Sequence, residues 1–229
     1  MTTLTTRKSI IEEKKVIGSV LTKIQKTFFD EADLQFYKDD NEEHLYWELF
    51  DCINNKIINY NTHTKIFGLK HPDIDTFVTK LTEKLTELFQ KFNLTDFIVL
   101  SHLKINFFGN RDNNFKPLKD AYSKLEKIIK GKAYKEAIVF DISELANIIE
   151  ILFWTARCDP STAEYIFLFD TEERVQIHLC KYGNIHLTEL KNEQITNKLL
   201  TSLGWTIIDG QEFDNFVLEG KIEGRKLKV

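Results

Sequence analysis

Two histidines and one cysteine lie close together between residues 175 and 188, and side chains of these types bind zinc. Apolar residues alternate with polar ones along 175–179 and again along 185–188, which predicts two half-buried strands. A three-residue turn with Gly183 in the left-handed conformation would place His178 opposite His186, with Cys180 on the same face. No fourth ligand is evident, so we favour an ordinary mixed sheet face and expect no metal ion and no other cofactor.

The second candidate for chemistry is an acidic residue followed by a Glu-x-Lys tripeptide, an arrangement that metal-dependent nucleases use. Asp170 ends one predicted strand, and Glu189 and Lys191 stand at the end of a later one. The same tripeptide pattern occurs at three other places in this charged sequence, so its presence carries little information. Nucleophile-elbow, phosphate-loop, zinc-protease and dinucleotide-binding motifs are absent from the sequence.

The elements that must position these residues divide the chain into two parts. Residues 1–160 predict amphipathic helices, because apolar residues recur at helical spacing between residues 10 and 28, after Pro72 and after Pro117. Residues 161–229 predict an antiparallel meander of three strands followed by a short helix. Residues 97–100 form an apolar run that fits either a strand or a buried helix. We therefore expect a single α+β domain over residues 1–229, with a largely helical N-terminal two thirds and a C-terminal antiparallel β-meander capped by a helix.

The composition of the 229 residues excludes several classes of protein. A disordered chain would lack the 18 phenylalanines and the hydrophobic fraction of 42%. Three cysteines without a paired spacing are too few for a disulfide-stapled scaffold, and they fit buried thiols in a reducing cytosol. The first nine residues carry no apolar signal-peptide core, and no stretch is long and apolar enough to span a bilayer. We therefore expect a cytoplasmic protein that does not bind a membrane.

The net charge of −4 conceals two oppositely charged regions. Residues 30–51 contain nine acidic side chains against Lys38, a balance of −8, whereas residues 104–135 contain nine basic side chains against three acidic ones, a balance of +6. The acidic segment also contains aromatic residues of the kind that interfaces favour as anchors. Its candidate partner-binding residues are Asp33, Phe36, Tyr37, Asp39, Asp40, Glu42, Glu43 and Trp47. The alternatives are a solvated surface whose aromatic residues pack inward, or pairing of the two charged regions with each other.

One stretch of the chain resembles a known group of proteins. It extends from Glu-Tyr-Ile-Phe-Leu-Phe-Asp at residues 164–170 to Cys-Lys-Tyr-Gly-Asn-Ile-His-Leu-Thr at residues 180–188. Together with the acidic surface and the missing catalytic motifs, it resembles the immunity proteins that protect bacteria from their own polymorphic or contact-delivered toxins. The resemblance implies a protein that binds a toxin domain tightly and blocks its active site without catalysing a reaction. It covers about a tenth of the chain, and no functional residue is carried over from it.

These observations favour a non-catalytic protein-binding protein, an immunity or antitoxin-like inhibitor that blocks a toxin domain through its acidic surface. We expect a protein partner, in particular a basic toxin domain, since an acidic surface steers a basic partner toward it. Nucleic acid is not expected as a partner of a chain with a negative net charge. The first alternative is a metal-dependent hydrolase or nuclease using Asp170, Glu189 and Lys191, and the second is a structural or regulatory subunit.

Overall fold

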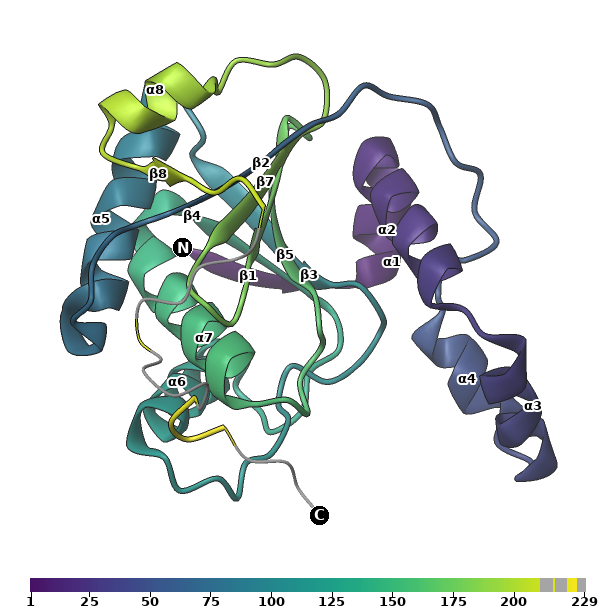
Figure 1. The fold of residues 1–229 in the computed structure, drawn as a ribbon. Coiled ribbons are helices and arrows are strands. Elements are labelled where there is room, and N and C mark those ends of the chain that lie inside the picture. Colours follow the sequence, from purple (N-terminus) through teal and green to yellow (C-terminus); the bar gives the residue numbers. More distant parts are fainter. Residues whose placement is uncertain (211–215, 217–221, 226–229) are drawn as a thin grey trace.

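Strands from the whole length of the chain form one antiparallel sheet in the computed structural model, which describes residues 1–210, 216 and 222–225 (Figure 1). The strands are β1 (Thr2–Thr5), β2 (His63–Gly68), β3 (Asp96–Ser101), β4 (Ala137–Asp141), β5 (Ile166–Asp170), β6 (Val175–Leu179), β7 (Ile185–Glu189) and β8 (Thr206–Ile207). Their order across the sheet is β1-β4-β3-β5-β6-β7-β2-β8. The sheet therefore joins segments that lie far apart in the sequence.

Helices lie on both sides of this sheet. They are α1 (Arg7–Glu13), α2 (Lys15–Phe28), α3 (Glu31–Asp39), α4 (Glu43–Leu49), α5 (Ile74–Lys91), α6 (Lys116–Ile129), α7 (Leu145–Cys158) and α8 (Asn197–Ser202), with a 3₁₀ turn at Ile142–Glu144. Helices α5, α6 and α7 lie on one side, whereas α1 and α2 lie on the other (Figure 1). Helices α3 and α4 project away from the sheet beyond the end of α2 (Figure 1).

The predicted division into a helical part over residues 1–160 and a β-meander over residues 161–229 is wrong. Four strands, β1 to β4, lie within the first part, and helices alternate with strands along the chain. The threonine-rich β1 and the partly polar β2 carry little strand signal of their own. They are held by partners far along the chain, since Thr2 pairs with Phe140 and His63 pairs with Glu189. Long-range pairing overrides local preference at these positions.

The predicted meander itself is confirmed. Strands β5, β6 and β7 pair in succession, with His178 opposite His186 and Leu179 opposite Ile185. Gly183 has a φ of +80°, as the three-residue turn requires, and a Cβ atom there would lie 2.8 Å from the Phe77 ring. Glycine is therefore needed both for the backbone conformation and for the close approach of α5.

The two faces of the sheet are covered to different extents. The larger core packs α5, α6 and α7 against one face through residues such as Phe89, Phe97 and Phe153. A second core packs α1 and α2 against the other face, around Leu21 and Phe169. Strand β5 is buried throughout, whereas β6 and β7 alternate between buried and half-buried positions. The face of β6 and β7 beside α2 therefore stays partly accessible.

A buried arginine fixes the N-terminal helices and the end of α4 to the sheet. Arg7 is fully buried, and its Nε and Nη2 donate to the two carboxylate oxygens of Asp51 at 2.8 and 3.1 Å. Its Nη1 donates to the Ser101 carbonyl at 2.7 Å. Gln25 of α2 donates to Asp51 at 2.9 Å and to the His102 carbonyl at 3.1 Å. This network sets the base from which α3 and α4 project.

Candidate protein-interaction site

The acidic segment forms a helical hairpin, which we call the arm and define as residues 30–51. Asp30 caps α3, since its carboxylate accepts a hydrogen bond from the Ala32 amide at 2.7 Å. Asn41 adopts a φ of +60° in the turn between the two helices. The arm extends away from the sheet (Figure 1).

The predicted partner-binding residues all lie on the arm. Helix α3 carries Asp33, Phe36, Tyr37 and Asp39, the turn carries Asp40 and Glu42, and α4 carries Glu43 and Trp47. The structure places all of them on one projecting hairpin (Figure 1).

One side of the arm is an aromatic cluster. Tyr46 and Phe50 are buried in it, and the Tyr46 hydroxyl donates to the Asp30 carbonyl at 2.8 Å. Tyr37 is half-buried and its ring lies 5.3 Å from that of Tyr46. Phe29 stacks on Trp47 with the ring centroids 5.8 Å apart. The alternative in which the aromatic residues pack inward is therefore met for Tyr46 and in part for Tyr37, whereas Phe36 and Trp47 stay exposed.

The arm also exposes apolar side chains. Among the described residues, five large hydrophobic side chains are exposed, and three of them lie on the arm: Phe36 at 67%, Trp47 at 39% and Leu45 at 38%. A scattered exposed residue needs no explanation, whereas a group of them on one projecting element is typical of an interaction site. Leu45 is not among the predicted partner-binding residues.

The acidic groups are compensated mainly at the base of the arm. Glu48 lies 4.0 Å from Lys104 and 3.3 Å from Lys135, so the basic region does pair with this one end of the arm. Nearer the tip, Lys38 lies 3.7 Å from Glu43. Within the described part of the chain, Asp33, Asp40 and Glu42 have no ion pair. The tip therefore keeps an excess of negative charge facing solvent.

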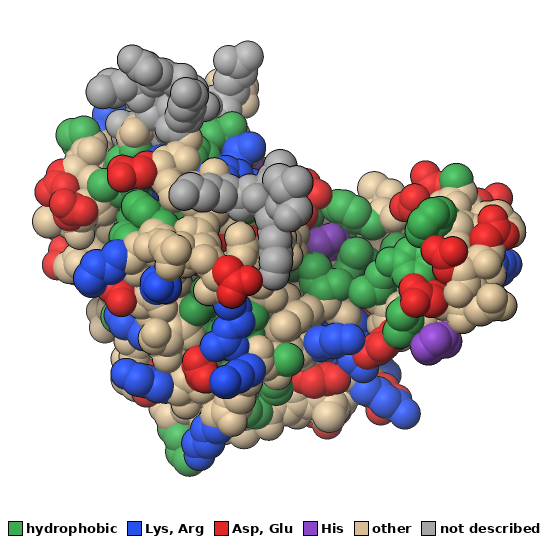
Figure 2. Space-filling view, turned by 90° about the horizontal axis from the view of Figure 1, so that it is seen from below, with side chains coloured by type: hydrophobic (Ala, Val, Ile, Leu, Met, Phe, Trp, Pro, Cys, Tyr) green, Lys and Arg blue, Asp and Glu red, His purple; other side chains and the backbone are tan. Residues whose placement is uncertain are grey.

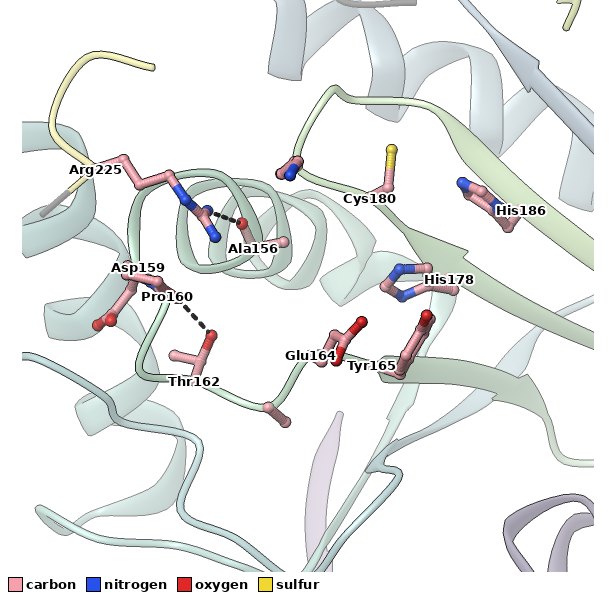
Figure 3. Close-up of a pocket in the computed structure, with 12 residues that line it drawn as sticks. Ala156, Asp159, Pro160, Thr162, Glu164, Tyr165, His178, Cys180, His186 and Arg225 are labelled. Atoms are coloured by element: carbon pink, nitrogen blue, oxygen red, sulfur yellow. Dashed lines mark hydrogen bonds between the residues drawn. The ribbon is translucent and has the colours of Figure 1, made fainter. Parts of the chain in front are cut away.

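The meander histidines occupy the register that the sequence predicted. The rings of His178 and His186 lie 5.6 Å apart across β6 and β7. Burial lowers the pKa of His178 to about 4, so this imidazole is neutral at physiological pH. The Cys180 sulfur points away from the His178 ring (Figure 3). Among the described residues, no group of three or more His, Cys, Asp and Glu side chains could hold a metal ion.

A cavity of about 500 Å³ opens on one side of these histidines (Figure 3). Two of its charged side chains, Asp159 and Arg225, are engaged by the fold. Asp159 accepts hydrogen bonds from the Asn110 amide at 2.6 Å and from the Tyr122 hydroxyl. Arg225 donates through Nη1 to the carbonyls of Ala156 and Arg157 at 3.0 and 2.8 Å. These contacts give the charged groups structural roles in holding the chain around the cavity.

A smaller groove of about 280 Å³ lies on the other side of His178 and His186, between α2 and the partly open face of β6 and β7. Its walls are mainly rings: Phe28 lies 5.8 Å from Tyr165, and Tyr165 lies 5.0 Å from His178. His102 is buried beside them, with its ring 4.6 Å from that of Phe28. Sequence reasoning missed this groove, because Phe28 and Tyr165 come from distant segments and each fits an ordinary apolar pattern.

Asp170 and Glu189, the acidic pair of the alternative hydrolase, lie at the ends of the interior strands β5 and β7. Their carboxylate oxygens accept hydrogen bonds from the nearby backbone. Asp170 accepts from the Val175 amide at 2.7 Å and from the Arg174 Nε at 2.7 Å. Glu189 accepts from the Gln194 and Ile195 amides at 2.6 and 3.0 Å. Lys191 donates to the Glu172 carbonyl at 2.9 Å. The hydrolase stays a prediction that these contacts do not favour.

Comparisons with other proteins give no relative from which a role could be taken. No protein-family model, no curated protein and no solved structure matches this chain. In the part of the chain that the structure describes, no helix is long and apolar enough to cross a membrane. The arm and the groove are therefore the features of the chain that point to a role.

Proposed function

We propose that this chain is a non-catalytic protein-binding protein, an inhibitor of the immunity-protein type, which blocks a basic toxin domain through its arm. One observation carries the proposal: exposed apolar side chains and uncompensated acidic groups occur together on the element that projects from the sheet. Protein interfaces combine apolar anchors with a polar rim, and charge complementarity steers the partner.

Two further observations support this role. The base of the arm is fixed by the bidentate contact of Arg7 with Asp51, so the exposed residues are held on a rigid support rather than on a loose loop. Rigid support lowers the entropy cost of binding. The three cysteines are buried and form no disulfide bond, which suits the cytoplasm, where we place the action of the protein.

Two charge variants with the same total charge test the proposal. The arm variant combines Asp33→Lys, Asp40→Lys and Glu42→Lys, and the control variant combines Glu83→Lys, Glu87→Lys and Asp120→Lys. Each changes the net charge from −4 to +2. The control positions lie on α5 and α6, away from the arm, and their ion pairs are surface pairs of small worth.

The experiment captures partners from the native cell with immobilised chain and then measures inhibition. We expect a basic protein that the wild type and the control variant retain and the arm variant loses. One equivalent of wild-type chain should inhibit the activity of that protein. Equal retention by the arm variant, or capture without inhibition, would overturn the proposal.

A further inference from the structure

The groove beside α2 and the arm border one concave surface (Figure 2). Phe28 forms a wall of the groove, and the next residue, Phe29, stacks on Trp47 of the arm. Figure 2 shows apolar side chains lining the concave surface between the arm and the body of the molecule, with acidic side chains over the arm. A partner that contacts the arm from this side therefore meets the groove as well.

The lining of the groove differs from the arm in charge. Ile24, Phe28, Tyr165 and Phe167 supply apolar surface, and no Asp, Glu, Lys or Arg side chain is among the described residues that line it. His178 and His186, which lie opposite each other on the neighbouring strands β6 and β7, also line the groove. An uncharged, ring-walled concavity favours an apolar side chain, because aromatic walls gain from ring contacts and a charged group would lose its hydration there.

We propose that this groove receives one aromatic or aliphatic side chain of a basic protein partner, presented among lysine and arginine residues. The inference rests on the proposed function, since the arm supplies the charge complementarity that selects a cationic partner. The arm borders the same concave surface (Figure 2) and carries a balance of −8 over residues 30–51 before its ion pairs are counted. An apolar anchor beside a polar rim is the arrangement of a binding hot spot.

Two synthetic peptides serve as probes for this arrangement. One has three lysines on each side of a tryptophan, and the other has alanine in place of the tryptophan. Calorimetry measures both peptides against the wild type, the arm variant, and variants in which a large ring fills the groove. Thr188→Trp fills it from β7, and Gln176→Trp fills it from β6 in case the first does not fold. Thr3→Trp, on β1 at the opposite edge of the sheet, is the matched control.

We expect the wild type and Thr3→Trp to bind the tryptophan peptide about tenfold more tightly than the alanine peptide, as burial of one large ring implies. The filled-groove variants should lose this preference and still bind both peptides. The arm variant should weaken both peptides by the same factor and keep the preference.

The possible failures are distinguishable. Equal binding of the two peptides by the wild type, with the arm dependence intact, overturns the groove proposal and leaves the proposed function standing. A tryptophan preference that survives both filled-groove variants also overturns it. If the arm variant binds both peptides as tightly as the wild type does, and only the filled-groove variants lose the tryptophan preference, the result counts against the proposed function instead. Self-association that Thr188→Trp abolishes would identify a second copy of the chain as the occupant of the groove. Binding of free indole as tight as that of the tryptophan peptide would identify a small molecule as the occupant. Either result overturns the inference.

Discussion

Replacing Arg7 with methionine should destabilise the protein more than any exposed ion-pair substitution. Methionine keeps much of the apolar length of the side chain but removes the guanidinium that joins α1, the end of α4 and β3. The change leaves the Ser101 carbonyl without this donor, and Asp51 keeps the Gln25 amide as its remaining side-chain donor. The base of the arm therefore loses its main polar contact.

The magnitude follows from the burial of the two partners. Breaking a buried ion pair from one side costs about 3–5 kcal/mol, because the remaining charge stays desolvated. The Arg7 side chain is 1% exposed, whereas that of Asp51 is 18% exposed and regains some hydration. We therefore expect Arg7→Met to lower the free energy of unfolding by about 3 kcal/mol, at the lower end of that range.

Urea unfolding, followed by circular dichroism and tryptophan fluorescence, measures this loss. Arg111→Met is the control, because Arg111 is 33% exposed in its ion pair with Glu126 and should cost less than about 1 kcal/mol. Removing both charges in Arg7→Met with Asp51→Leu should recover part of the stability, since an apolar pair leaves no buried charge. A loss for Arg7→Met no larger than that for Arg111→Met would refute the structural role of the network.

Two further predictions concern buried groups of the meander. Asp170→Ala should lower the free energy of unfolding by about 3 kcal/mol, because it leaves the Arg174 and Val175 amides without their acceptor and removes one charge partner of the Arg174 guanidinium. The exposed Glu172→Ala should change it little, and equal urea midpoints for the two variants would contradict this. Acidification should destabilise the fold through His178. Its pKa of about 4 in the folded chain lies below the value in the unfolded chain. Between pH 6.5 and 4 the unfolded chain therefore binds a proton at this residue that the folded chain does not. Between pH 7 and 5 the wild type should therefore lose about 2 kcal/mol more than His178→Phe, and parallel stability curves for the two proteins would disprove it.

Local patterns in the sequence are enough to predict the meander and the long helices. Alternation and the turn at Gly183 determine the His178 and His186 register, since both depend on residues within a short hairpin. Asp73 caps α5 one residue after Pro72, and Pro117 lies in the first turn of α6. Each of these signals acts within a few residues, where sequence reasoning is strongest.

The features that sequence reasoning missed depend on contacts between distant segments. Apolar spacing predicted a helix through residues 10 to 28, but the chain breaks at Lys14 and restarts as α2. The Glu173 carboxylate accepts hydrogen bonds from the Val16 and Ile17 amides at 2.6 and 3.0 Å, so a residue of the meander caps that helix. The groove likewise requires Phe28 and Tyr165 to meet. Neither contact leaves a local pattern in the sequence.

The association rate of the captured partner tests the central claim most directly, because the arm is proposed to steer a basic protein. Stopped-flow mixing would compare the wild type, the arm variant and the control variant of equal net charge at low and at physiological salt. We expect the arm variant to associate at least about tenfold more slowly at low salt, with the gap narrowing as salt screens the charges, and the control variant to match the wild type. Equal slowing of both variants, or unchanged rates in both, would show that the arm does not guide the partner.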